Sequence, residues 1–180
     1  MKILLNTLIV SAGLVLSAHA FSESNDDKTV RAQSAAHSDL SAQATIIDTD
    51  GAVLKEGSGH WHCVPGIPVI AGDSHPMCND PVWSKFLAAA ATGSDFTTDR
   101  IGISYMLQGD ANVSNANPAA TDPNNGDVWV EEGPHIMIIV PKELLKGISD
   151  DPYNGGPYVM WKDTPYAHIM VPIQNKELSE

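Results

Sequence analysis

Basic residues are scarce in this chain of 180 residues, which has 10 lysines and arginines, 22 aspartates and glutamates and a formal net charge of −12. Because this charge repels phosphate groups, it disfavours nucleic acids and anionic membrane surfaces as partners, and the sequence predicts no nucleic-acid partner. A cationic ligand or a metal ion is compatible with the composition. A solvated acidic surface explains the same composition equally well.

Long hydrophobic runs are also absent. The apolar run within the first twenty residues, MKILLNTLIVSAGLVLSAHA, is shorter than the roughly 20 residues that a membrane span requires. Lys2, the run itself and the small residues of Ala18-His19-Ala20 have the pattern of a secretory signal peptide. The sequence therefore predicts export to the bacterial periplasm or medium, cleavage after Ala20, and no membrane anchor after cleavage.

Recognisable catalytic motifs are missing as well. The chain has no G-x-S-x-G elbow, no H-E-x-x-H and no phosphate-cradling loop. Asp73, Ser74 and His75 have the composition of a catalytic triad, but consecutive residues cannot easily orient as nucleophile, base and orienting group. Whether the protein is an enzyme is left undecided, and a non-catalytic function is favoured.

The segment 108–127 is rich in asparagine, aspartate, proline and glycine and has no apolar period. A loop of this length inside a compact domain is often functional or disordered. Asp110, Asp122 and Asp127 could offer oxygen ligands to Ca²⁺, but their spacing matches no EF-hand. A solvated loop is the simpler interpretation.

Only two cysteines are present, Cys63 and Cys78. In an exported protein an even number of cysteines within a segment rich in proline and glycine predicts a disulfide. A metal-binding or redox-active thiol pair is the alternative, but the spacing is not C-x-x-C, and an oxidising compartment disfavours free thiols.

The order of the segments predicts one domain. Residues 21–44 are polar and small, which predicts a flexible leader because they offer too little apolar surface to offset the entropy of ordering. We expect a signal peptide at 1–20, a single globular domain at 45–175 and a short tail at 176–180.

The clearest element is a helix over 81–92. Asn79 or Asp80 can cap its first turn, Pro81 suits its first position, and Gly93 ends it. About six to seven strands, joined by hairpin-like links, are expected before and after this helix along the chain. The expected fold is therefore α+β, with a mainly antiparallel sheet and one helix packed on it.

A short pattern recurs three times near the end of the chain, as GPHIM, GPYVM and YAHIM. In a strand, residues i and i+2 point to the same face. The pairs that share a face are then His135 with Met137, Tyr158 with Met160, and His168 with Met170.

The last two of these strands are separated by DTPYA, which favours an antiparallel hairpin. If Met160 pairs with His168, Tyr158 lies opposite Met170, and all four side chains stand on one face. A slip of one residue would destroy this arrangement.

Imidazole and thioether groups together suit copper, especially Cu(I), so copper is the candidate cofactor. Core packing of the same side chains is the alternative, and it is favoured because methionine fills irregular gaps in cores. The candidate metal ligands are His135, Met137, Met160, His168 and Met170, with His60 and His62 as a further pair on one face.

Within residues 45–173, four segments are distinctive enough to compare with a known family. They are HCVPGIPVIAGDSHPMCNDPVW, YMLQGDANVSNANP, GPHIMIIVP and NGGPYVMWKDTPYAHIMVPI. In them the chain resembles a family of small exported bacterial proteins of uncharacterised function. The resemblance implies a single exported domain and assigns neither an activity nor site residues.

Three function classes follow from these observations. The favoured one is an exported soluble binding protein with copper as its most concrete ligand. The second is a small hydrolase or isomerase that uses His135 or His168 as a general base under a lid formed by 108–127. The third is a structural or interaction module tethered by its leader.

Overall fold

The computed structural model describes residues 23–70 and 72–174. The expected signal peptide at 1–20 and the tail at 176–180 lie outside the described residues. Within the described ranges no helix combines the length and the apolar character needed to cross a bilayer.

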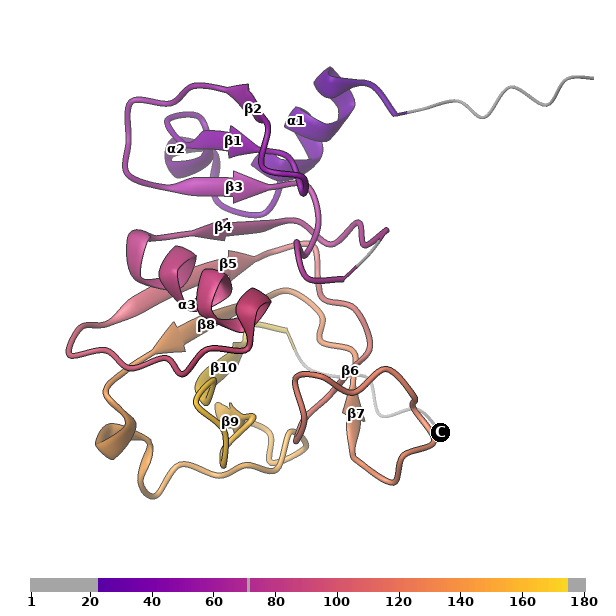
Figure 1. Cartoon of the computed structure of the whole chain (residues 1–180), viewed down its shortest axis with the longest axis vertical. Helices are drawn as coiled ribbons and strands as arrows, with labels where there is room; N and C mark the ends of the chain where they lie inside the picture. Colours follow the sequence, from indigo (N-terminus) through magenta and orange to yellow (C-terminus); the bar gives the residue numbers. More distant parts are fainter. Residues whose placement is uncertain (1–22, 71, 175–180) are drawn as a thin grey trace, which may run out of the picture.

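The fold is built on one sheet of eight strands in the order β2-β1-β3-β4-β5-β8-β10-β9 (Figure 1). All neighbours are antiparallel except β1 and β3. The strands are β1 (Thr45–Ile47), β2 (Val53–Lys55), β3 (His62–Val64), β4 (Met77–Asn79), β5 (Gly102–Met106), β8 (His135–Ile139), β9 (Tyr158–Met160) and β10 (His168–Pro172).

The expected α+β class with a mainly antiparallel sheet is confirmed, and the sheet is larger than expected. Strands β1 to β4 are only three residues long, too short to show a clear alternation of apolar and polar residues. Their pairing is stabilised by the predicted disulfide, since Cys63 and Cys78 are bonded and lie directly opposite each other in β3 and β4.

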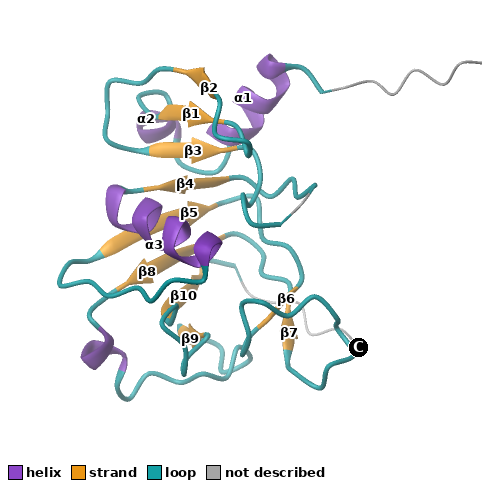
Figure 2. Ribbon diagram, in the orientation of Figure 1, coloured by secondary structure: helices purple, strands orange, loops and turns teal. Residues whose placement is uncertain are grey.

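The predicted helix is α3 (Pro81–Thr92), which crosses one face of the sheet (Figure 2). Asp80 caps it by accepting a hydrogen bond of 2.7 Å from the backbone N–H of Trp83, and Gly93 ends it with a left-handed φ of 66°. Trp83 and Phe86 are buried against the sheet, so α3 covers the face on which the repeated pattern lies.

The expectation of a flexible leader is wrong for residues 23–44. This segment forms α1 (Asn25–Gln33) and α2 (Ser38–Ser41), and α1 packs on the sheet face opposite α3. Ala32 and Ala35 are completely buried in a cluster with the disulfide. The small side chains of Ala32 and Ala35 allow this close packing, and Leu40 packs against the same cluster; composition alone does not reveal such packing.

The segment 108–127 is an ordered connection that leads into a small second sheet of β6 (Val113–Ser114) and β7 (Trp129–Val130). Asn115 Nδ2 donates to the carbonyl of Asp150 at 2.9 Å, and the indole N–H of Trp161 donates to the carbonyl of Ser114 at 2.8 Å. A short 3₁₀ turn, η1 (Lys142–Leu145), follows β8.

Candidate functional site

The hairpin formed by β9 and β10 has the register predicted from the sequence. Met160 lies opposite His168, and Tyr158 lies opposite Met170. Strand β8 lies on the other side of β10, where Met137 is opposite Met170. The repeated pattern therefore builds one continuous surface on a single face of three neighbouring strands.

The same face carries more methionines than the repeated pattern alone supplies. Met106 of β5 lies opposite His135 of β8, and Met77 of β4 joins the same core. We call the two histidines and five methionines of this face the His/Met layer. It consists of Met77, Met106, His135, Met137, Met160, His168 and Met170, each no more than 4 % exposed.

Core packing therefore accounts for the burial of the His/Met layer. Trp83 and Phe86 of α3 belong to the same hydrophobic cluster as the methionines. The layer is closed to solvent, so any ligand reaches it only when part of the shell opens.

His168 is enclosed by aromatic rings. The ring centroids of Trp83, Phe86 and Trp161 lie 5.3, 5.7 and 5.1 Å from that of the imidazole. Burial lowers the pKa of His168 to about 4, because a charged imidazole is disfavoured away from water. The ring is therefore neutral at neutral pH.

The tautomer of His168 follows from its hydrogen bond. Its Nδ1 lies 2.9 Å from the carbonyl oxygen of Tyr166, and a carbonyl can only accept, so Nδ1 carries the proton. The lone pair then lies on Nε2. Nδ1 of His135 likewise lies 2.7 Å from the carbonyl oxygen of Gly133. A ring nitrogen that donates to a backbone carbonyl is the usual second contact of a metal-binding histidine.

Trp161 reaches His168 through an unusual backbone conformation. Its φ is 55°, in the left-handed region that disfavours side chains, at a cost of about 1–3 kcal/mol. Two hydrogen bonds of 2.8 Å hold it there, from its backbone N–H to the carbonyl of Asn115 and from its indole to Ser114. The segment 108–127 therefore positions one wall of the enclosure around His168.

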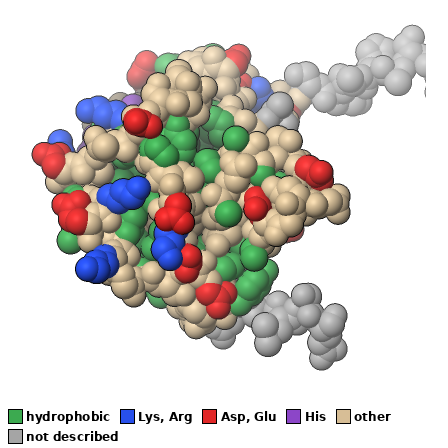
Figure 3. All heavy atoms as spheres, turned by 60° about the horizontal axis from the view of Figure 1, so that its bottom comes forward, with side chains coloured by type: hydrophobic (Ala, Val, Ile, Leu, Met, Phe, Trp, Pro, Cys, Tyr) green, Lys and Arg blue, Asp and Glu red, His purple; other side chains and the backbone are tan. Residues whose placement is uncertain are grey.

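An open cleft of about 440 Å³ lies beside this enclosure, between the segments 95–98, 139–143 and 163–167. Its lining includes three carboxylates, Asp95, Glu143 and Asp163, and one amine, that of Lys142. Figure 3, which views the end of the molecule carrying β9 and η1, shows acidic and basic groups around hydrophobic surface.

The floor of the cleft touches the His168 enclosure. Ile139, which lines the cleft, follows Ile138, whose partner in β10 is Ile169, the residue next to His168. Phe96, also in the lining, contacts Phe86 at a centroid distance of 5.5 Å. One layer of side chains therefore separates the cleft from the imidazole.

The remaining candidate ligands are not brought together. His60 is exposed in a loop, and His62 lies on β3, three strands from β8 in the sheet order. Asp122 and Asp127 accept hydrogen bonds from their own loop. Among the residues that the structure describes, no three His, Cys, Asp or Glu side chains are grouped so as to hold a metal ion.

Sequence reasoning missed a polar cluster at one end of the sheet. Asp73 Oδ1 lies 2.6 Å from Nδ1 of His75. The carboxylate of Asp73 can therefore orient the imidazole, although only one residue separates the two in the chain. Glu132 is 3 % exposed and accepts a hydrogen bond of 2.8 Å from the hydroxyl of Tyr158. Asp110, which the sequence placed in a solvated loop, is 7 % exposed.

The carboxyl of Asp110 has a strongly perturbed acidity. Burial raises its pKa to about 7, and the neighbouring carboxylates of Asp73 and Glu132 act in the same direction. A hydrogen bond of 2.7 Å from the backbone N–H of Ala111 and the charge of His75 oppose this rise. Acids with such shifts are concentrated at functional sites.

Comparisons of the chain with protein-family models, with curated proteins and with solved structures give no match.

Proposed function

We propose that this protein is an exported binding protein that holds a soft metal ion, copper in its Cu(I) state, at the His168 end of the His/Met layer. The observation that carries the proposal is the cross-strand pair of Met160 and His168, with Met170 two residues further along the same strand face. Nε2 of His168 and the two thioether sulfurs are the proposed ligands.

The chemistry of this donor set favours Cu(I). Thioether sulfur is a soft ligand that selects Cu(I), and neutral imidazole accompanies it well, whereas Ca²⁺ and Mg²⁺ prefer oxygen. The low pKa of His168 keeps its lone pair available to metal throughout the neutral range. The rings of Trp83, Phe86 and Trp161 surround the imidazole and keep water away from it.

Two features of this region are costly for a purely structural core. First, the core position at 168 holds a polar imidazole and not an apolar side chain. Second, the indole N–H of Trp83 is buried without a hydrogen-bond partner in the described part of the chain. Unsatisfied buried polar groups destabilise a fold. The unsatisfied indole N–H of Trp83, whose ring contacts His168, supports a function for the layer beyond packing.

The cleft supplies a route for the ion. Its three carboxylates exceed its single lysine, so it attracts cations, and its floor is shared with the His168 enclosure. Because the layer is closed, binding requires Ile139 or Phe96 to move aside. We therefore expect binding to be slow compared with diffusion and limited by this opening.

An anaerobic titration with Cu(I), using a chromogenic chelator as competitor, tests the proposal. The informative variant is M160L/M170L, because leucine conserves volume in a core while removing the sulfur ligands. The matched control is M77L/M106L, which removes two thioethers from the far end of the same layer. Wild type and control should bind one equivalent, and M160L/M170L should bind at least tenfold more weakly.

Two outcomes would contradict the proposal. The first is a wild-type protein with no saturable binding of Cu(I). The second is equal affinity in M160L/M170L and wild type, which would place the ion elsewhere. Circular dichroism of each variant verifies that the fold is retained.

A further inference from the structure

The polar cluster missed in the sequence lies where three strand ends meet. His75 precedes β4 by two residues, Asp110 follows the end of β5, and Glu132 precedes β8. Since β4, β5 and β8 are antiparallel neighbours, these three positions lie at the same end of the sheet. Tyr158, at the start of β9, reaches the same region through its hydrogen bond to Glu132.

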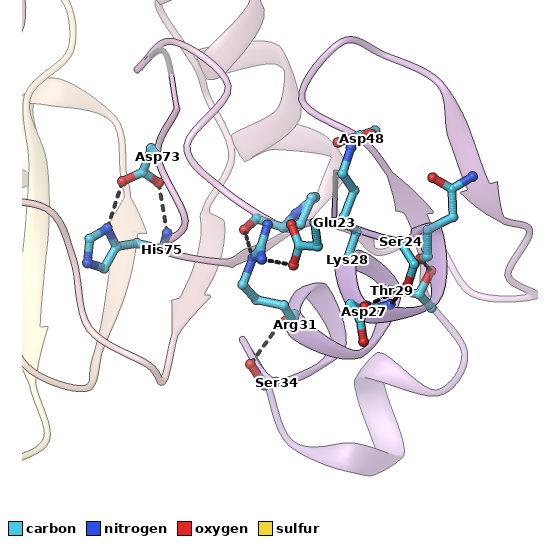
Figure 4. Close-up of polar contacts among 12 residues, drawn as sticks. Glu23, Ser24, Asp27, Lys28, Thr29, Arg31, Ser34, Asp48, Asp73 and His75 are labelled. Atoms are coloured by element: carbon cyan, nitrogen blue, oxygen red, sulfur yellow. Dashed lines mark hydrogen bonds and ion pairs between the residues drawn. The ribbon is translucent and has the colours of Figure 1, made fainter. Parts of the chain in front are cut away.

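His75 is held in one orientation by Asp73, as Figure 4 shows. The second carboxylate oxygen of Asp73 accepts hydrogen bonds from the backbone N–H groups of Ile67 and His75, at 2.7 and 2.9 Å. The Asp73 side chain is 3 % exposed, whereas that of His75 is 36 % exposed. The fixed carboxylate of Asp73 therefore holds Nδ1 of His75. The lone pair of this imidazole lies on Nε2, and solvent reaches the ring.

Asp110 complements this base with an acid. One oxygen of its carboxyl accepts from the backbone of Ala111, and no hydrogen bond joins the other to a described residue. It forms no ion pair with any lysine or arginine in the described ranges. A buried acid that is kept without a counter-ion costs stability, and such costs are typical of functional sites.

We propose that this cluster is a hydrolytic acid–base site for small carboxylic esters, in which His75 is the general base, Asp110 is the general acid and Asp73 is a positioning residue. It is separate from the proposed copper site. In this proposal His75 takes the role of general base that the sequence suggested for His135 or His168, both of which are buried.

The reaction needs only water as co-reactant. Nε2 of His75 takes a proton from water as the water oxygen bonds to the acyl carbon and the π pair of the carbonyl moves onto the carbonyl oxygen. The carbonyl then re-forms as the ester C–O bond breaks, and the Asp110 carboxyl gives its proton to the departing oxygen, which yields an acid and an alcohol. The proton on His75 returns to the Asp110 carboxylate through solvent, which restores both groups.

Two ester probes separate the two roles. p-Nitrophenyl acetate releases a stable phenolate that needs no proton, so its hydrolysis reports the base alone. Phenyl acetate releases a more basic oxygen and therefore needs the acid. General acid–base groups contribute on the order of a hundredfold or more to rates. We expect a loss of that size from H75A on both probes, and a loss from D110N that is larger on phenyl acetate than on p-nitrophenyl acetate.

A matched control exists on the surface. His37 lies 3.9 Å from Asp39, with its side chain 78 % exposed, so H37A removes a histidine near an aspartate without touching the cluster. It should leave both rates unchanged. D73N should lower both rates and flatten their pH profile, because the amide favours the tautomer with the proton on Nε2.

The proposal is overturned if wild type hydrolyses p-nitrophenyl acetate no faster than H75A at equal concentration. It is also overturned if H37A lowers the rate as much as H75A, since the activity would then be that of any exposed imidazole. Equal losses from D110N on both probes would remove Asp110 from the role of acid. Thermal unfolding of H75A and D110N verifies that each variant is folded.

Discussion

Replacement of Asp110 by asparagine should stabilise the protein at neutral pH and have no effect in acid. The pKa of this carboxyl is about 7 in the fold, against 3.8 when it is unperturbed. A raised folded-state pKa means that the native state holds the proton more tightly than the unfolded chain does. The associated stability is fully present below the unfolded value and is lost as pH rises through about 7.

The size of the effect follows from the shift. Each unit of pKa difference corresponds to about 1.36 kcal/mol, so ionisation of Asp110 lowers the free energy of unfolding by about 4 kcal/mol between about pH 4 and pH 7. The asparagine amide has nearly the same shape, can accept the bond from Ala111 and carries no charge to bury. D110N should therefore match wild type near pH 4 and exceed it by up to about 4 kcal/mol at pH 8.

Urea unfolding of both proteins at intervals from pH 4 to pH 8 measures this difference. D122N is the control, because it makes the same substitution at an aspartate that is exposed in the loop. Parallel curves for wild type and D110N would refute the reasoning, since Asp110 would then titrate alike in the folded and unfolded states. If D110N gains stability while losing phenyl acetate hydrolysis, the acid is retained for function.

Three further changes test the fold. Deletion of residues 23–44 should lower the thermal midpoint by several degrees, because it uncovers the disulfide cluster that contains Ala32; an unchanged midpoint would show that this segment does not dock. Reduction of Cys63–Cys78 should lower the free energy of unfolding by about 3 kcal/mol, as measured in urea with and without reductant, and two alkylated thiols without prior reduction would exclude the bond. Asp80→Ala should cost about 2 kcal/mol, since this carboxylate both caps α3 and accepts a bond from β5; a loss comparable to that of an exposed aspartate would contradict this.

Local signals predicted the elements that depend on neighbouring residues. Asp80, Pro81 and Gly93 mark the limits of α3 because capping and left-handed termination are chemical properties of those residues. The β9–β10 register was predictable because a period of two and a short hairpin link allow few pairings. The sharing of one face by His168, Met170 and Met160 followed directly.

Long-range packing was not readable from the sequence. The leader looked disordered because alanine and serine carry little apolar surface, yet Ala32 and Ala35 pack closely over the disulfide. Asp110 looked like a loop residue, and only the fold buries it beside Glu132. The closeness of Asp73, Ser74 and His75 in the chain argued against a catalytic triad. The fold nevertheless brings two of them together, since one oxygen of Asp73 binds the backbone of Ile67 and the other faces the imidazole of His75.

X-ray absorption spectroscopy of the protein loaded anaerobically with one equivalent of Cu(I) tests the central claim most directly. The method reports the type of atom bound to the metal, independently of affinity. With Met160, His168 and Met170 as ligands, the spectrum should show sulfur together with one imidazole nitrogen, and M160L/M170L should lose the sulfur signal. A spectrum with only nitrogen and oxygen ligands in the wild-type protein would contradict the claim and leave the His/Met layer as packing alone.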